Sequence, residues 1–147
     1  MENHYDSKAD TLEHIREVNK NLIEFAMAIL ERAKKHDESK LHSPEKEIFD
    51  KYTPILKDLK YGTKEYFDNM ENIKPATDHH YKNNSHHPQF HEKGIDGMCL
   101  IDIIEMFADW KAATKRTEGG DILKSIEINK DRFKMSEQLV NILKNTW

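Results

Sequence analysis

The chain has 147 residues, with 37% hydrophobic and 34% charged side chains and a formal net charge of -4 at pH 7. This length fits one domain that buries roughly 70% of the surface of the unfolded chain, so we expect a single domain over residues 1–147. The mean hydropathy is -0.88, yet apolar residues recur at helical spacing, which argues against a disordered chain. The acidic balance gives no general attraction for nucleic-acid polymers, which are not expected as partners.

Targeting signals and cysteine content bear on where the protein works. No apolar run approaches the ~18–20 residues that span a bilayer, and the first residues lack the basic and apolar regions of a signal peptide. The single cysteine, Cys99, cannot form an internal disulfide, as is usual in a reducing compartment. We therefore expect a cytoplasmic protein without a membrane partner. The sequence leaves the oligomeric state open.

The first predicted element is a long amphipathic helix. It is expected to start at Ser7 or Asp10 and to end near Lys35. Its apolar positions follow an a/d-like spacing, which predicts one buried face. They are Ile15, Val18, Leu22, Phe25 and Ile29.

Two further helices are expected before the histidine-rich region. Residues 43–45, Ser-Pro-Glu, provide a cap, a proline at the first helical position and an acid in the first turn. Pro54 lies inside this second helix and is expected to kink or interrupt it. Residues 61–63, Tyr-Gly-Thr, predict a stop and a new cap, followed by a third helix toward Pro75 and His80.

The second half of the chain begins with a predicted loop over residues 84–97, which has no sustained period. The next helix, from Met98 to about Lys115, is the most apolar and is expected to be central. Residues 119–121, Gly-Gly-Asp, predict the end of one helical region and the cap of the next, and a last short helix begins at residues 136–137. No segment alternates with a period of two, so we expect an all-α, compact, single-domain helical bundle.

Histidine is the compositional anomaly, because five of the nine histidines fall within 13 residues. The clustered ones are His79, His80, His86, His87 and His91. Together with nearby carboxylates, imidazoles suit a borderline transition metal. The sequence thus predicts one or two divalent ions of Mn, Fe, Co, Ni or Zn. His4 and His42 are expected at the surface, and His91 is equally consistent with a hydrogen-bond donor in the loop.

Two acidic groups are candidates to complete such a site. Asp37 follows His36 at the expected end of the first helix, where it is free to bridge two ions. Glu105 and Asp109 are four residues apart and share one face of the apolar helix. From spacing alone, a solvated stripe that also includes Asp102 and Arg116 explains these acids equally well.

Three motifs carry a resemblance to known families. Residues 36–40, His-Asp-Glu-Ser-Lys, resemble the His-Asp-x-x-Lys signature of HD-domain phosphohydrolases, an all-helical superfamily that places the doublet on a metal. The chain is also similar to a family of small bacterial and phage proteins of unknown function. Its marks are His-Asp-x-Ser-Lys at 36–40, His-x-x-x-Asn-x-His-His at 80–87 and Glu-Met-x-x-Asp-Trp at 105–110.

The resemblance implies an HD-like domain that acts as a metal-dependent phosphohydrolase on a small nucleotide or related phosphate ester. The implied metal ligands are His36, Asp37, His80, one or both of His86 and His87, and Asp109. Lys40 would contact the phosphate, and Asn84 would orient a ligand or the substrate. Glu105 would act as an acid in an outer position, next to the metal ligands and not on the metal itself, or as a proton acceptor. A surface ion pair for Lys40 and turn capping for Asn84 remain open readings.

The departures from the HD pattern define the alternatives. The Gly-Tyr-Pro element of the HD-GYP branch is absent, which argues against hydrolysis of cyclic dinucleotides. His14 resembles the first HD ligand, but on one unbroken helix it would lie about 33 Å from His36, so it joins the site only if the chain breaks near residues 19–21. A non-catalytic metal-binding or phage accessory protein and an HD-type di-iron oxygenase are the other function classes that fit these residues.

Overall fold

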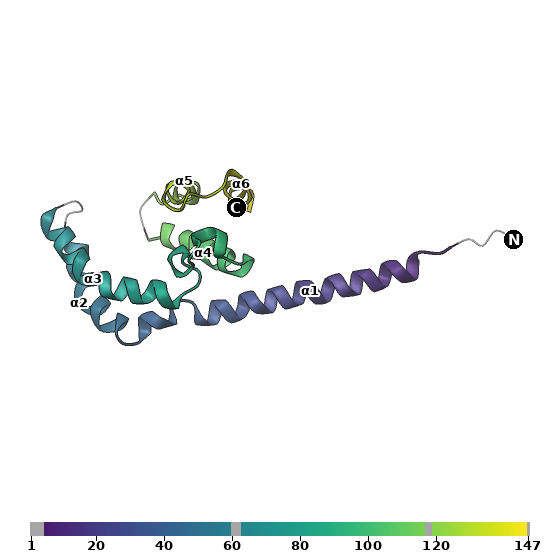
Figure 1. The fold of residues 1–147 in the computed structure, drawn as a ribbon, viewed down its shortest axis with the longest axis horizontal. Helices are drawn as coiled ribbons and strands as arrows, with labels where there is room; N and C mark the ends of the chain where they lie inside the picture. Colours follow the sequence, from purple (N-terminus) through teal and green to yellow (C-terminus); the bar gives the residue numbers. More distant parts are fainter. Residues whose placement is uncertain (1–4, 60–62, 117–118, 147) are drawn as a thin grey trace.

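The computed structural model describes residues 5–59, 63–116 and 119–146, and over these ranges it contains α-helices and short 3-10 helices without strands (Figure 1). The prediction of an all-helical fold is confirmed. In chain order the elements are α1 (Lys8–Lys35), η1 (Glu38–Leu41), α2 (Glu45–Asp58), α3 (Lys64–Asn83), η2 (Pro88–Phe90), η3 (Gly94–Gly97), α4 (Leu100–Thr114), α5 (Ile122–Phe133) and α6 (Glu137–Thr146).

The apolar helix α4 occupies the centre, as its composition predicts. The C-terminal part of α1 packs along it, while α5 and α6 cover another side (Figure 1). The aromatic rings of Trp110 and Phe133 stack with centroids 6.1 Å apart. The buried cluster between these helices consists of Phe107, Ile126, Met135, Val140 and Leu143. Because this core anchors α4, it also fixes the acidic side chains on the opposite face of that helix.

The helix starts largely follow the capping signals. The Thr63 hydroxyl accepts a hydrogen bond from the backbone N–H of Tyr66, and the Asp121 carboxylate accepts one from Leu123. The predicted stop at Tyr61 and Gly62 lies outside the described residues. Of the expected kink or interruption at Pro54, the interruption is wrong, because α2 continues through it. A proline removes one hydrogen bond, and the packing of α2 on α3, the most extensive helix contact, holds the helix together despite that loss.

The prediction of a buried face along α1 is also wrong for the single chain, because none of its residues is buried. The 28-residue helix is about 42 Å long, whereas α4, with 15 residues, is about 22 Å long and covers only the C-terminal part. The N-terminal half therefore projects beyond the other helices (Figure 1). The spacing identified the apolar face correctly, but it carried no information on what covers that face.

Candidate metal centre

Three segments that are distant in sequence meet at one place: the end of α1, the end of α3 with the loop after it, and the middle of α4. Their ligand atoms form three groups, and within each group the atoms lie within 4.8 Å of one another. One group contains Asp37, His80, His86 and His87. A second contains His36, Asp37 and Asp109, and a third contains His36, His86 and Glu105. The six residues that the resemblance implied as ligands are thus brought together.

The first group points four atoms at a common centre. The Oδ1 atom of Asp37 lies 3.2 Å from Nε2 of His80 and 3.5 Å from Nε2 of His86. The Nε2 atoms of His80 and His87 are 2.9 Å apart. Two atoms bound side by side to one ion at ~2.0–2.1 Å are about 3 Å apart. The spacing therefore fits shared coordination of one cation.

Unpaired polar atoms mark the same point. Within the described ranges, the buried side-chain atoms that lack a hydrogen-bond partner are Oδ1 of Asp37 and Nε2 of His86. Buried polar atoms nearly always have a partner, since losing hydration without one is costly. These two atoms belong to different segments and face each other, so a cation between them would satisfy both.

The backbone at Asp37 is unusual and explains how α1 delivers the His-Asp doublet. Asp37 has φ 57° and ψ 15°, a left-handed conformation that few residues other than glycine adopt. This turn ends α1 after Lys35 and starts η1, so His36 and Asp37 sit at the bend. Strained backbone of this kind concentrates at functional sites.

Asp37 offers one oxygen to each of the first two groups. Its Oδ2 accepts a hydrogen bond from Lys40 Nζ at 2.6 Å and lies 3.6 Å from Nε2 of His36. Burial by itself would raise the pKa of the Asp37 carboxyl, but the nearby His80 ring and the Lys40 ammonium hold that pKa well below its usual range. The group is therefore an anion at neutral pH, placed to bridge these two groups.

The second group is richer in negative charge. His36 Nε2 lies 3.8 Å from Oδ1 of Asp109, and hydrogen bonding to Asp109 and then to Glu105 raises the pKa of His36 to about 10. The same contact with His36 lowers the pKa of Asp109. The pocket thus stabilises positive charge beside Asp109, which is the electrostatic character that a metal cation needs.

Two outer carboxylates orient the imidazole rings. Glu45 is 0% exposed, and its Oε2 atom accepts from Nδ1 of His80 at 2.9 Å. Glu105 Oε1 lies 2.9 Å from Nδ1 of His36 and 3.1 Å from Nδ1 of His86. A carboxylate that holds Nδ1 fixes the ring and leaves Nε2 free for a metal. Glu105 also belongs to the third group, so its outer position stays a prediction.

A half-buried ion-pair network contacts Glu105 on the side away from the histidines. Arg32 of α1 donates to Oε2 of Glu105 at 2.9 Å, to Oγ of Ser85 at 2.7 Å and to the buried carboxylate of Asp102. Ser85 also donates to Asp102. The alternative of a solvated acidic stripe on α4 is therefore wrong for Asp102 and Glu105, because both are turned inward toward Arg32.

Polar side chains complete the support around His80. Asn84 Nδ2 donates to Oγ of Ser39 and to the backbone oxygen of His80, both at 2.8 Å. Ser39 Oγ in turn donates to Oε2 of Glu45 at 3.0 Å.

The surroundings of His87 favour its neutral form. Burial has the largest effect and the neighbouring His86 and His80 add to it, so the pKa of His87 is lowered to about 3. A neutral imidazole is the form that binds a metal.

The sequence missed Glu45 and Arg32. An acid in the first turn of a helix is so common that Glu45 gave no separate signal. Arg32 did carry one, because it continues the a/d-like series of Ile29 at a position otherwise reserved for apolar residues. A charged residue in such a register indicates a buried partner, here found on α4.

Three other histidines of the described ranges lie outside the centre. α1 is unbroken, so His14 lies about 33 Å along the helix from His36 and takes no part in the site. His42 is exposed, as expected. His91 hydrogen-bonds to the backbone oxygen of Ser85 at 2.8 Å, in agreement with a loop donor. His4 lies outside the described residues.

Fold and site together define a helical protein with a cluster of histidines and carboxylates in metal-ligand geometry. The chain belongs to a family of unknown function, DUF5662, whose model matches residues 3–147. Neither a curated protein nor a solved structure matches the chain. In the described part of the chain, no helix has both the length and the apolar character needed to cross a membrane.

Proposed function

We propose that this centre binds one or two divalent transition metal ions and hydrolyses a small phosphate ester, with a nucleotide as the expected substrate class. The observation that carries the proposal is the convergence of His86 Nε2 and Asp37 Oδ1, both buried without a partner, beside the Nε2 atoms of His80 and His87. The resemblance of residues 36–40 to the HD signature supports the reaction class.

The donor set fits such ions. His80, His86, His87 and Asp37 would hold one ion, and His36, Asp37 and Asp109 would hold a second. Imidazole with carboxylate suits Mn, Fe, Co, Ni or Zn better than Mg. A bound ion of this kind supplies hydroxide from water at neutral pH and neutralises charge on phosphoryl oxygens.

The side chains around the ligands have distinct tasks. Lys40 is 39% exposed at the rim, where its ammonium is available to attract a phosphate while it pairs with Asp37. Asn84 keeps Ser39 and the end of α3 in place behind His80. Glu105 anchors the imidazoles of His36 and His86 and is available as an outer proton acceptor.

The experiment is a phosphate-release screen over nucleotides and simple phosphate esters, with Mn²⁺, Co²⁺, Ni²⁺ or Zn²⁺ added to chelator-free protein. We expect metal-dependent release by the wild-type chain, loss of release in His87→Gln, and unchanged release in His42→Gln, which alters an exposed histidine. Bound metal without release from any ester would favour the non-catalytic alternative. Iron content with oxygen consumption would favour the di-iron oxygenase.

A further inference from the structure

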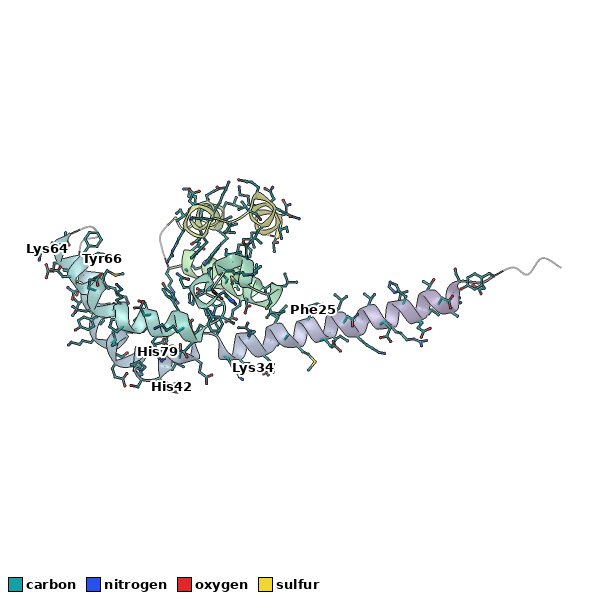
Figure 2. All side chains as sticks on the ribbon, in the orientation of Figure 1. Phe25, Lys34, His42, Lys64, Tyr66 and His79 are labelled. Atoms are coloured by element: carbon teal, nitrogen blue, oxygen red, sulfur yellow. The ribbon has the colours of Figure 1, made fainter. Side chains whose placement is uncertain are left out.

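The middle of α1 is apolar on nearly all sides. From residue 22 to residue 30 Glu24 is the only charged residue, and the others are Leu22, Ile23, Phe25, Ala26, Met27, Ala28, Ile29 and Leu30. A helix that is apolar all round is normally buried. In the single chain, however, Met27 and Leu30 are each 60% exposed. Phe25, labelled in Figure 2, lies where α1 extends past α4.

The charges of α1 are confined to one side over a longer stretch. If Ile15 and Leu22 take heptad position a, then Val18 and Phe25 take position d. The flanking e and g positions from residue 12 to residue 28 carry no acid, lysine or arginine. They are Leu12, His14, Asn19, Asn21, Ala26 and Ala28. The uncharged face is thus wide, and its alanines allow a second helix to approach closely.

An apolar cavity lies in line with this face. It has a volume of about 250 Å³ between α1 and α4 and borders the candidate metal centre, because Arg32, His36, Glu105 and Asp109 line it. Its apolar lining consists of Ile29, Ala33, Ile101, Ile104, Ala108 and Ala112. Ile29 belongs both to the cavity and to the a positions of α1. Each chain therefore presents an uncovered apolar helix at one end of α1 and an open apolar groove beside the other end.

We propose that a second copy of this chain covers α1, with the two α1 helices antiparallel about a two-fold axis. Antiparallel pairing follows because α4 lies on the same face of α1 at its C-terminal half, beside Ile29 and Arg32, so a parallel pair would bring the two α4 helices together. A two-fold axis lets one surface serve both copies. In the register that keeps a opposite d, Val18 faces Leu22 of the second copy and Ile15 faces its Phe25.

The charge pattern favours a second copy over a lipid surface. The polar side of α1 between residues 12 and 28 carries three acids against two basic residues, at Glu13, Glu17, Glu24, Arg16 and Lys20. Helices that lie on membranes are rich in lysine and arginine on that side, because these residues attract anionic lipids. In the antiparallel pair these mixed charges all point away from the contact and remain in water.

The test is the molar mass of the full chain in solution, measured by light scattering after gel filtration at micromolar concentration. The chain mass is 17.4 kDa, and we expect twice that value. Leu22→Glu is expected to give a monomer. Ile128→Glu makes the same change at an exposed position on α5 and is expected to remain a dimer. A monomeric wild-type chain, or a dimeric Leu22→Glu chain, would overturn the proposal.

A crosslinking arm tests the arrangement and covers the case in which Leu22→Glu loses helical circular dichroism. In a Cys99→Ser background, Val18→Cys and Leu22→Cys chains are mixed and gently oxidised, and we expect a covalent dimer because facing residues lie within disulfide reach. Absence of that product would overturn the antiparallel pair. A monomeric chain that sediments with phosphatidylcholine and phosphatidylglycerol vesicles would assign the face to lipid instead. None of these outcomes depends on metal or phosphate chemistry.

Discussion

The two ends of α1 follow the same helical period and meet opposite environments. At the C-terminal end, Arg32 pairs with two inward-facing acids of α4, and His36 and Asp37 enter a cluster built from three segments. At the N-terminal end, equally regular apolar positions such as Leu22 are 59% exposed. A periodic stripe thus defines a face, while a charged residue within the stripe indicates where the chain itself provides the partner.

The largest effect is expected from Asp37→Ala. Asp37 contributes an oxygen to two of the three ligand groups, so its removal should lower metal affinity by more than about 100-fold. Equilibrium dialysis followed by elemental analysis measures this, with His42→Ala as the exposed control. Metal retention by Asp37→Ala equal to that of His42→Ala would contradict the assignment of the cluster.

Arg32→Gln tests the ion-pair network behind the cluster. The change leaves Asp102 and Glu105 turned inward without their cation, so we expect the free energy of unfolding to fall by about 2–3 kcal/mol. Urea unfolding monitored by circular dichroism measures it. Arg16→Gln, on the projecting half of the same helix, should change the value by less than about 0.5 kcal/mol. Equal effects of the two changes would argue against a structural difference between the two ends of α1.

Glu45→Gln separates orientation from ligation. The amide cannot match a carboxylate as an acceptor from Nδ1 of His80, so metal affinity should fall about 10- to 100-fold while the helices remain. Titration calorimetry with Zn²⁺ measures the affinity. Glu47→Gln alters an exposed residue of the same helix and should bind like the wild type. Unchanged affinity in Glu45→Gln would remove Glu45 from the site.

The smallest stability effect is expected from Lys40→Ala. Its pair with Asp37 is partly exposed, so the free energy of unfolding should change by less than about 1 kcal/mol. If phosphate esters are the substrates, KM should nevertheless rise, because the substrate phosphate loses its contact with the Lys40 ammonium at the edge of the site. Lys46→Ala removes a comparable exposed lysine that pairs with Asp50 and should leave KM unchanged. A wild-type KM in Lys40→Ala would exclude the proposed phosphate contact.

Much of the fold could be predicted from local signals. The caps at Thr63 and Asp121 and the apolar run of α4 are properties of short segments, and the structure confirms them. The path of α2 through Pro54 could not be predicted in the same way, since it depends on packing against α3. The exposure of α1 also depends on what lies beside it, and no local pattern carries that information.

The candidate ligands could be predicted from residue type and motif, whereas the residues that orient them could not. His80, His86 and Asp37 are recognisable because imidazole and carboxylate are metal ligands in motif spacing. Glu45 acts through His80 from a helix whose position is set by tertiary packing. The role of Glu45 can be recognised only in the structure, where Nδ1 of His80 contacts Glu45 and Nε2 of the same ring faces Asp37 and His87.

The most direct measurement is the number of metal ions bound per chain after dialysis of chelator-free protein against Mn²⁺ or Zn²⁺. We expect one or two ions for the wild type and none for His80→Ala/His86→Ala, because those imidazoles come from α3 and its loop and face the carboxylate at the end of α1. A wild-type chain that retains no ion, or a double variant that retains as many as the wild type, would contradict a common cation joining these segments.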